Sequence, residues 1–178
     1  MKRVLIVVVI ALLAPGLARA AELPETTAQV KQGRQLFQRS AKGLACATCH
    51  SMEGFGNAIG PDLRHLASSF TPRALVMTIH MNTTVYVQEV KLSNGLTFPG
   101  IQKRKDNGMV EFWDLSQNPP RLTKWKDSSV AGTRPNGAWQ HPPAMTGYAQ
   151  QELADIVGYL KFVATGMEKE VTVEDLRK

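Results

Sequence analysis

Apolar residues recur at helical spacing near the start of the chain. Val30, Gly33 and Phe37 follow one another at intervals of three and four residues, which is the period of an amphipathic helix. Thr26 precedes this pattern and can cap the free N–H groups of a first turn. We therefore expect a helix over about residues 27–40.

A longer pattern of the same kind lies near the end of the chain. The apolar residues at positions i, i+3, i+4 and i+7 are Leu153, Ile156, Val157 and Leu160. Gly166 can end this helix in a left-handed conformation, and we expect the charged tail after it to fray. Thr71-Pro72 is a further helix start, because proline tolerates the first helical position, and it predicts a short helix from Pro72 to about Met81.

The stretch between these helices has β-type patterning. Runs rich in valine, threonine and aromatic residues are separated by the turn signals Asn94-Gly95 and Asp106-Asn107-Gly108. The expected strands cover about residues 85–92, 96–102, 109–115 and 122–130, and residues 131–149 are expected to form a loop. The predicted fold class is therefore mainly α, with a small antiparallel β meander of three or four strands inserted at about residues 84–130.

The first twenty residues have the layout of a secretory signal peptide. Lys2 and Arg3 precede an apolar run, Val4–Ala14, and Ala18-Arg19-Ala20 supplies small residues around a cleavage point. The run is too short for a spanning helix, which needs about 20 apolar residues. With residues 1–20 removed, residues 21–178 would form a single soluble domain in the periplasm. The alternative is an uncleaved leader, which would bring the protein into contact with the membrane.

Composition and charge narrow the classes of function. The chain has 178 residues, about one domain, and its 21 Lys and Arg against 15 Asp and Glu give a net charge of +6. Loss of three basic residues with the leader lowers this charge to +3. Nucleic-acid binding loses its support, because no basic stripe with interleaved aromatics remains beyond Lys103-Arg104-Lys105. That run is a solvated patch or a surface that steers an acidic redox partner.

The two cysteines form one motif with a histidine. Cys46-Ala47-Thr48-Cys49-His50 is C-x-x-C-H, the signature of c-type haem attachment. Two thiols at this spacing can both reach the vinyl groups along one edge of a porphyrin, and the next histidine then lies under the iron. The motif predicts one haem c, bound through thioethers to Cys46 and Cys49, with His50 as an axial ligand of the iron.

Three other uses of the cysteines fit the sequence less well. A thiol redox motif would need a thioredoxin-like βαβ pattern around it, which is absent. A disulfide across two intervening residues closes a tiny loop and adds little stability. A zinc site would need two more well-placed ligands.

A haem iron that transfers electrons needs a sixth ligand. We expect Met145, because it lies in an irregular, proline-stiffened segment just before the last helix, where a loop can present a thioether to a flat cofactor. Met81, at the end of the short helix, is the main rival, and His80 and His141 are further alternatives. The alternative role of any single methionine is core packing.

Four segments in order resemble the class I c-type cytochromes. They are Gly33 with Phe37, the Cys46–His50 motif, Gly60-Pro61-Asp62-Leu63, and Met145 followed by the helix that carries Tyr159. The resemblance covers about residues 27–80 and 141–164 and implies a helical haem fold in which Gly33 lets the first and last helices cross closely. The β-rich stretch departs from this family and is similar to insertions in haem domains of some bacterial dehydrogenase-like proteins.

The resemblance also implies roles around the haem. The Pro61 carbonyl would accept a hydrogen bond from the non-ligating nitrogen of His50, which fixes the tautomer. Leu63 would cover a haem face. Arg64 or Trp139 would reach a haem propionate, although Trp139 has an alternative role in the core.

Three functions remain open. The first is a mono-haem carrier, not an enzyme, that passes single electrons between periplasmic redox proteins, for example from a dehydrogenase to a terminal oxidase or reductase. The second is a dedicated haem c subunit of a larger oxidoreductase, with the β-rich stretch as a docking surface or as a lid over the haem edge. The third is a haem sensor or enzyme with an open sixth position. We expect the first.

Overall fold

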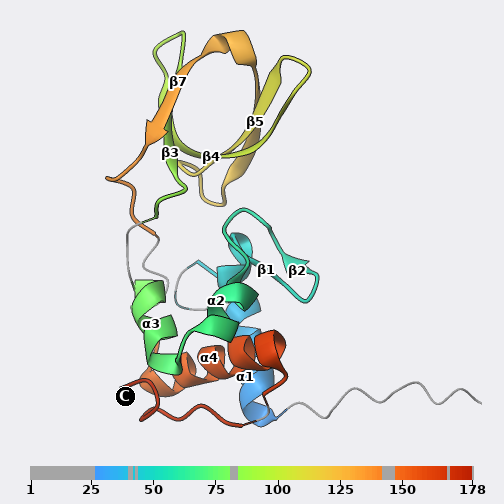
Figure 1. The fold of residues 1–178 in the computed structure, drawn as a ribbon, viewed down its shortest axis with the longest axis vertical. Helices are drawn as coiled ribbons and strands as arrows, with labels where there is room; N and C mark the ends of the chain where they lie inside the picture. The colour runs from blue at the N-terminus through green and yellow to red at the C-terminus, as the bar shows by residue number, and fades with distance from the viewer. Residues whose placement is uncertain are drawn as a thin grey trace, which may run out of the picture.

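The computed structural model describes residues 27–39, 42, 44–80, 84–141, 147–167 and 169–177. The predicted leader, Met81 and Met145 therefore lie outside the described residues. In the described part, helices form one end of the molecule and an antiparallel sheet forms the other (Figure 1). The α-helices are α1 (Ala28–Gln38), α2 (Leu63–Ser69), α3 (Pro72–His80) and α4 (Gln150–Thr165). Across these ranges, every helix is too short or too polar to cross a membrane.

The first and last helices cross closely, as the resemblance implied. A Cβ added to Gly33 would lie 2.0 Å from the carbonyl oxygen of Asp155, so only glycine fits at this crossing. Phe37 and Tyr159 pack beside it, with ring centroids 5.6 Å apart. The prediction for Gly33 is confirmed.

The predicted helices are present with small shifts at their ends. The cap of α1 is Thr27 in place of Thr26, and its hydroxyl accepts a hydrogen bond from the Val30 N–H at 3.2 Å. The expected terminator Gly166 follows α4 and has a left-handed φ of 68°. The spacing of apolar residues therefore predicts the ends of these helices to within two residues.

One helix, α2, has no counterpart in the sequence prediction. Asp62 caps it, because its carboxylate accepts a hydrogen bond from the Arg64 N–H at 2.9 Å. Ala67 is fully buried, and Leu63 and Leu66 are partly buried against the helical core. The helix is only seven residues long, so its apolar spacing makes too short a pattern to stand out.

The C-terminal tail packs against the start of α1. Gln29 exchanges two hydrogen bonds with the backbone of Val171, Nε2 to O at 2.7 Å and N to Oε1 at 2.8 Å. Val171 and Leu176 are buried in the helical core. The expectation that this tail frays is wrong, because two apolar residues among its charges anchor it.

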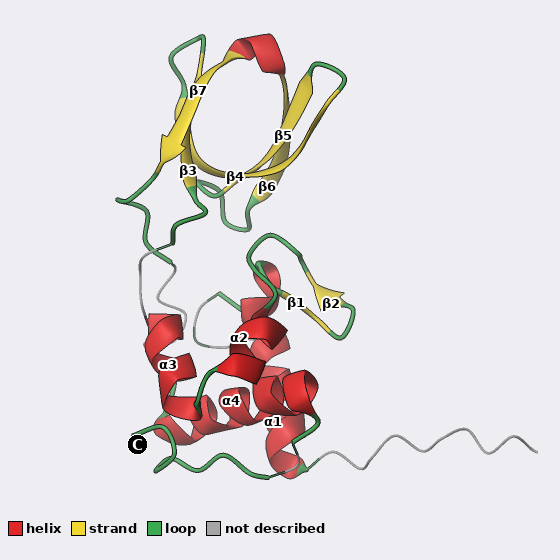
Figure 2. Cartoon of the chain, in the orientation of Figure 1, coloured by secondary structure: helices red, strands yellow, loops and turns green. Residues whose placement is uncertain are grey.

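The inserted sheet has five antiparallel strands in the order β6-β5-β4-β3-β7. They are β3 (Gln88–Leu92), β4 (Thr97–Asp106), β5 (Met109–Asp114), β6 (Arg121–Lys126) and β7 (Val130–Pro135). The predicted turns are confirmed, with Gly95 at φ 88° between β3 and β4 and Asn107 and Gly108 at φ 46° and 70° between β4 and β5. A 3-10 turn, η2 (Asp127–Ser129), joins β6 to β7, and the sheet curls round on itself (Figure 2).

The fifth strand, β7, lies where the sequence predicted a loop. It pairs with β3, with Val90 opposite Thr133. Most of its residues are exposed, and it contains Gly132 and Pro135, so it lacks the alternation of apolar and polar residues that marks a strand. The predicted insertion at 84–130 is therefore too short by this strand.

Two separate clusters of buried side chains hold the two ends of the molecule. The helical cluster includes Phe37, Met52 and Tyr159. The cluster under the sheet consists of Val90, Leu92, Phe98, Val110 and Phe112. Strands occupy about as many described residues as helices, so a mainly α fold is confirmed only in part: four α-helices and antiparallel sheets are present among the described residues.

Candidate cofactor site

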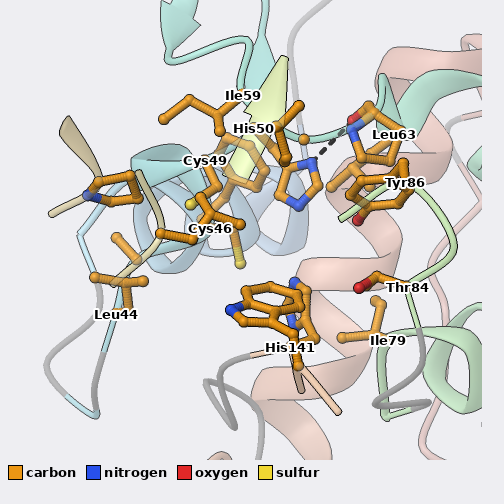
Figure 3. Close-up of a pocket in the computed structure, with 18 of the residues that line it drawn as sticks. Leu44, Cys46, Cys49, His50, Ile59, Leu63, Ile79, Thr84, Tyr86 and His141 are labelled. Carbon is orange, nitrogen blue, oxygen red and sulfur yellow. Dashed lines mark hydrogen bonds between the residues drawn. The ribbon is translucent and has the colours of Figure 1, made fainter. Parts of the chain in front are cut away.

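The cysteines lie on a short turn after α1. This turn, η1 (Cys46–Thr48), is followed directly by Cys49 and His50, and the His50 N–H donates to the Cys46 carbonyl at 2.9 Å. A two-stranded hairpin, β1 (Ser51–Met52) and β2 (Phe55–Gly56), continues the chain. The compact turn places both thiols and the imidazole on one wall of a cavity (Figure 3).

The His50 ring is held in one orientation. Its Nδ1 donates a hydrogen bond to the carbonyl oxygen of Pro61 at 2.8 Å. Gly60 lies against the same ring, and a Cβ added there would be 2.5 Å from the His50 Cε1. With Nδ1 engaged, Nε2 is the nitrogen that remains for a metal. The contact expected between His50 and Pro61 is therefore present.

Burial sets the protonation of these three groups. It raises the pKa of Cys46 to about 11 and raises that of Cys49 in the same direction. Burial also lowers the pKa of His50, against the opposing effect of its hydrogen bond to Pro61. A thiol that attacks disulfides has a lowered pKa, so these thiols do not have the character of a redox pair, whereas a neutral imidazole is the form that binds metals.

The cavity has a volume of about 380 Å³, within the range of about 300–1,000 Å³ typical of cofactor pockets. Its walls are mostly apolar, and their larger members include Phe37, Leu44, Ile59, Leu63, Leu66, Ile79, Tyr86 and Ile156. Thr84 adds a buried hydroxyl that has no hydrogen-bond partner among the described residues. An apolar pocket with one orphaned polar group suits a flat, mainly apolar cofactor that carries a polar edge.

The sheet closes one side of this cavity. Ile101 of β4 and five residues of the connection between β5 and β6 line it; the five are Leu115, Ser116, Gln117, Asn118 and Pro120. Sequence reasoning gave no signal that this connection faces a site. It also missed the lining residues Ile59, Thr84 and Tyr86, because single residues in loops carry no periodic pattern.

The structure brings most of the predicted site residues together. Leu63 and Trp139 line the cavity with the motif residues. Arg64 does not: it is exposed and forms a hydrogen-bonded ion pair with Asp62, with Nη2 to Oδ2 at 2.5 Å. The expected sixth ligand, Met145, lies outside the described residues.

The donor set fits haem better than a bare metal ion. Among the described residues, no group of three or more His, Cys, Asp and Glu side chains could hold an ion. A porphyrin supplies four of the iron's ligands itself, so the protein needs to supply only the axial positions. His50, the two thiols and the apolar cavity meet that requirement.

Comparison with known proteins agrees with this chemistry. A sequence model of the cytochrome c family matches residues 30–116, just under half of the 178 residues. The matched part contains the C-x-x-C-H motif, α2, α3 and the sheet as far as the end of β5. A search of curated proteins found no match. The family match supports a c-type cytochrome, and a cytochrome c domain implies covalently bound haem c and haem-based electron transfer.

Proposed function

We propose that this protein is a periplasmic mono-haem c-type cytochrome that transfers single electrons between redox proteins and is not itself an enzyme. The observation that carries the proposal is the wall of one apolar cavity formed by Cys46, Cys49 and the oriented ring of His50. When bound, the haem supplies an iron centre that takes up and releases one electron.

The residues of the site fix this group in place. Cys46 and Cys49 would each add their sulfur to one vinyl group of the porphyrin, with the thiol proton passing to the other vinyl carbon. His50 would bind the iron through Nε2, while the Pro61 carbonyl holds the ring and makes Nε2 a stronger donor. Gly60 leaves room for the ring in this orientation, because a Cβ at that position would lie 2.5 Å from the His50 Cε1.

The apolar walls would exclude water from a bound haem, and a few groups would meet its polar edge. Trp139 lines the cavity, and the buried hydroxyl of Thr84 can donate a hydrogen bond to a propionate. Arg64 would have to release Asp62 to do the same. We therefore assign the propionate contacts to Thr84 and Trp139.

The test is production of the full chain in a host that matures c-type cytochromes. We expect the periplasmic fraction to contain protein whose haem remains attached in a denaturing gel and which is reduced reversibly by one electron. Cys46→Ala combined with Cys49→Ala should lose the attached haem, whereas Ser116→Ala, at the cavity rim, should keep it. Absence of attached haem from the unaltered protein would refute the proposal.

The second candidate is a haem subunit of a larger oxidoreductase. The sheet favours it, because β6 is an edge strand that exposes Leu122 (42%) between the exposed basic residues Arg121 and Lys124. An apolar residue framed by basic ones suits an acidic protein partner. Untagged purification from the native source separates the two candidates, since a subunit would co-elute with its oxidoreductase and a free carrier would not.

A further inference from the structure

A second histidine faces His50 across the cavity. His141 lines the cavity, and its ring centroid lies 6.2 Å from that of His50, with 34° between the ring planes. Figure 3 labels both residues around the same space, with His141 drawn below His50. His141 comes from the segment that follows β7, so the strands of the sheet separate it from the C-x-x-C-H motif along the chain.

The separation of the rings fits a shared metal ion. A metal–imidazole nitrogen bond is about 2 Å long and the ring centre lies roughly 1 Å beyond the nitrogen, so an ion between two opposed imidazoles holds their centres about 6 Å apart. The observed centroid separation of 6.2 Å agrees with this span. The tilt of 34° is compatible with it, because each ring can rotate about its own metal–nitrogen bond.

The chain around His141 is fixed in place. The Trp139 N–H donates to Oδ1 of Asn136 at 3.0 Å, which makes a tight turn directly after β7. The Trp139 ring then meets the His141 ring edge-on, with centroids 6.4 Å apart. The turn after β7 and the contact with the Trp139 ring hold His141 in position. An axial ligand needs this kind of support.

We propose that His141, and not a methionine, is the sixth ligand, so that the iron has a histidine on each side. This inference rests on the proposed haem c function and deepens it. A methionine opposite histidine raises the reduction potential, so two histidines give a lower potential than the expected pair of His50 and Met145. The partners that exchange electrons with this protein would then work at correspondingly low potential.

The first test uses the unaltered, haem-loaded protein. We expect a six-coordinate low-spin spectrum in both oxidation states, without the weak long-wavelength band that reports an iron–methionine bond in the oxidised form. Electron paramagnetic resonance should give the signature of two imidazole ligands. A clear iron–methionine band would overturn the proposal without affecting the proposed electron-transfer function.

Variants then assign the ligand. His141→Ala should open the sixth position, so that carbon monoxide binds readily and added imidazole restores the low-spin spectrum. Met145→Ala, Met81→Ala and, as a matched control, His65→Ala should leave the spectrum unchanged. His141→Met should create the long-wavelength band and raise the midpoint potential.

The opposite pattern refutes His141 as the ligand. If Met145→Ala or Met81→Ala opens the sixth position while His141→Ala does not, a methionine is the ligand. If His141→Ala does not fold, the resonance spectrum of the unaltered protein still decides the question. Failure of haem attachment in every form, including the unaltered one, would instead refute the proposed function.

Discussion

The helical part and the sheet of this molecule are held together over very different distances along the chain. The helical part closes where α1 meets α4, at the contact of Gly33 with Asp155 near opposite ends of the sequence. The sheet is mostly a succession of neighbours, since β3, β4, β5 and β6 pair in chain order across short connections. The helical part therefore depends on a few long-range contacts, whereas the sheet depends on local patterns.

The same division runs through the cofactor site. The helical part supplies both thiols and His50, while the sheet supplies the β5–β6 connection at the rim. The chain that leaves β7 carries His141. A haem placed here would therefore contact both parts, so the sheet is part of the cofactor site.

The substitution with the largest expected effect tests whether the core of the sheet and the core of the helical part unfold independently. Phe112 is 1% exposed in the core of the sheet, and Phe112→Ala should destabilise that core by about 3–5 kcal/mol, because it removes a buried ring and leaves a cavity. Hydrogen exchange of backbone amides should speed up in β3 to β6 and stay slow in α1 and α4. Equal acceleration in both parts would show one cooperative unit.

A substitution at the helix crossing should give the reverse pattern. A Cβ at residue 33 would lie 2.0 Å from a backbone carbonyl, which cannot turn aside as a side chain can, so Gly33→Ala should cost about 1–3 kcal/mol of stability. Denaturant unfolding measures this loss, and hydrogen exchange should place it in α1 and α4. Gly132→Ala is the matched control, because a Cβ at that position meets nothing within 4 Å. A similar loss in both variants would contradict the explanation.

The smallest effect concerns the start of α4, which has alanine at its cap. Glu152 compensates by accepting hydrogen bonds from Lys42 Nζ at 2.5 Å and from the Ala149 N–H at 2.7 Å. The bond from Lys42 holds the pKa of Glu152 below its usual 4.5. A lowered pKa means that the carboxylate stabilises the fold above its usual pKa and that this contribution is lost as the pH falls through the lowered value.

Glu152→Gln should therefore lower the melting temperature slightly at neutral pH. The difference from the unaltered protein should shrink as the pH falls below 4.5, and thermal melts across that range measure it. Glu170→Gln, in the exposed part of the tail, is a control. A difference that stays constant on acidification would show that the carboxylate charge plays no part.

Local patterns explain which features the sequence predicts well. The period of Leu153 to Leu160, the turn at Asn94-Gly95 and the spacing of Cys46, Cys49 and His50 each carry their signal within a few residues. Each of these appears in the structure at the expected place.

The features that the sequence did not predict depend on distant partners. The strand β7 is defined by its pairing with β3 and has no alternation of its own. The tail is ordered because Val171 meets Gln29. The position of His141 near His50 depends on the fold of the whole sheet, which lies between the two residues along the chain. From the sequence alone, His141 is therefore only one of several candidates for the sixth ligand.

The crossing of α1 and α4 also explains how the helical part accommodates a five-stranded sheet between α3 and α4. Everything between the two helices is, in polymer terms, one closed loop, and each doubling of a loop's length adds only about 0.6 kcal/mol to the entropy cost of closing it. The sheet offsets that cost with a core of its own. The length of chain between α3 and α4 therefore has little effect on the free energy of bringing α1 and α4 together. The segments whose positions are constrained are the two that line the cavity, the β5–β6 connection and the segment with His141.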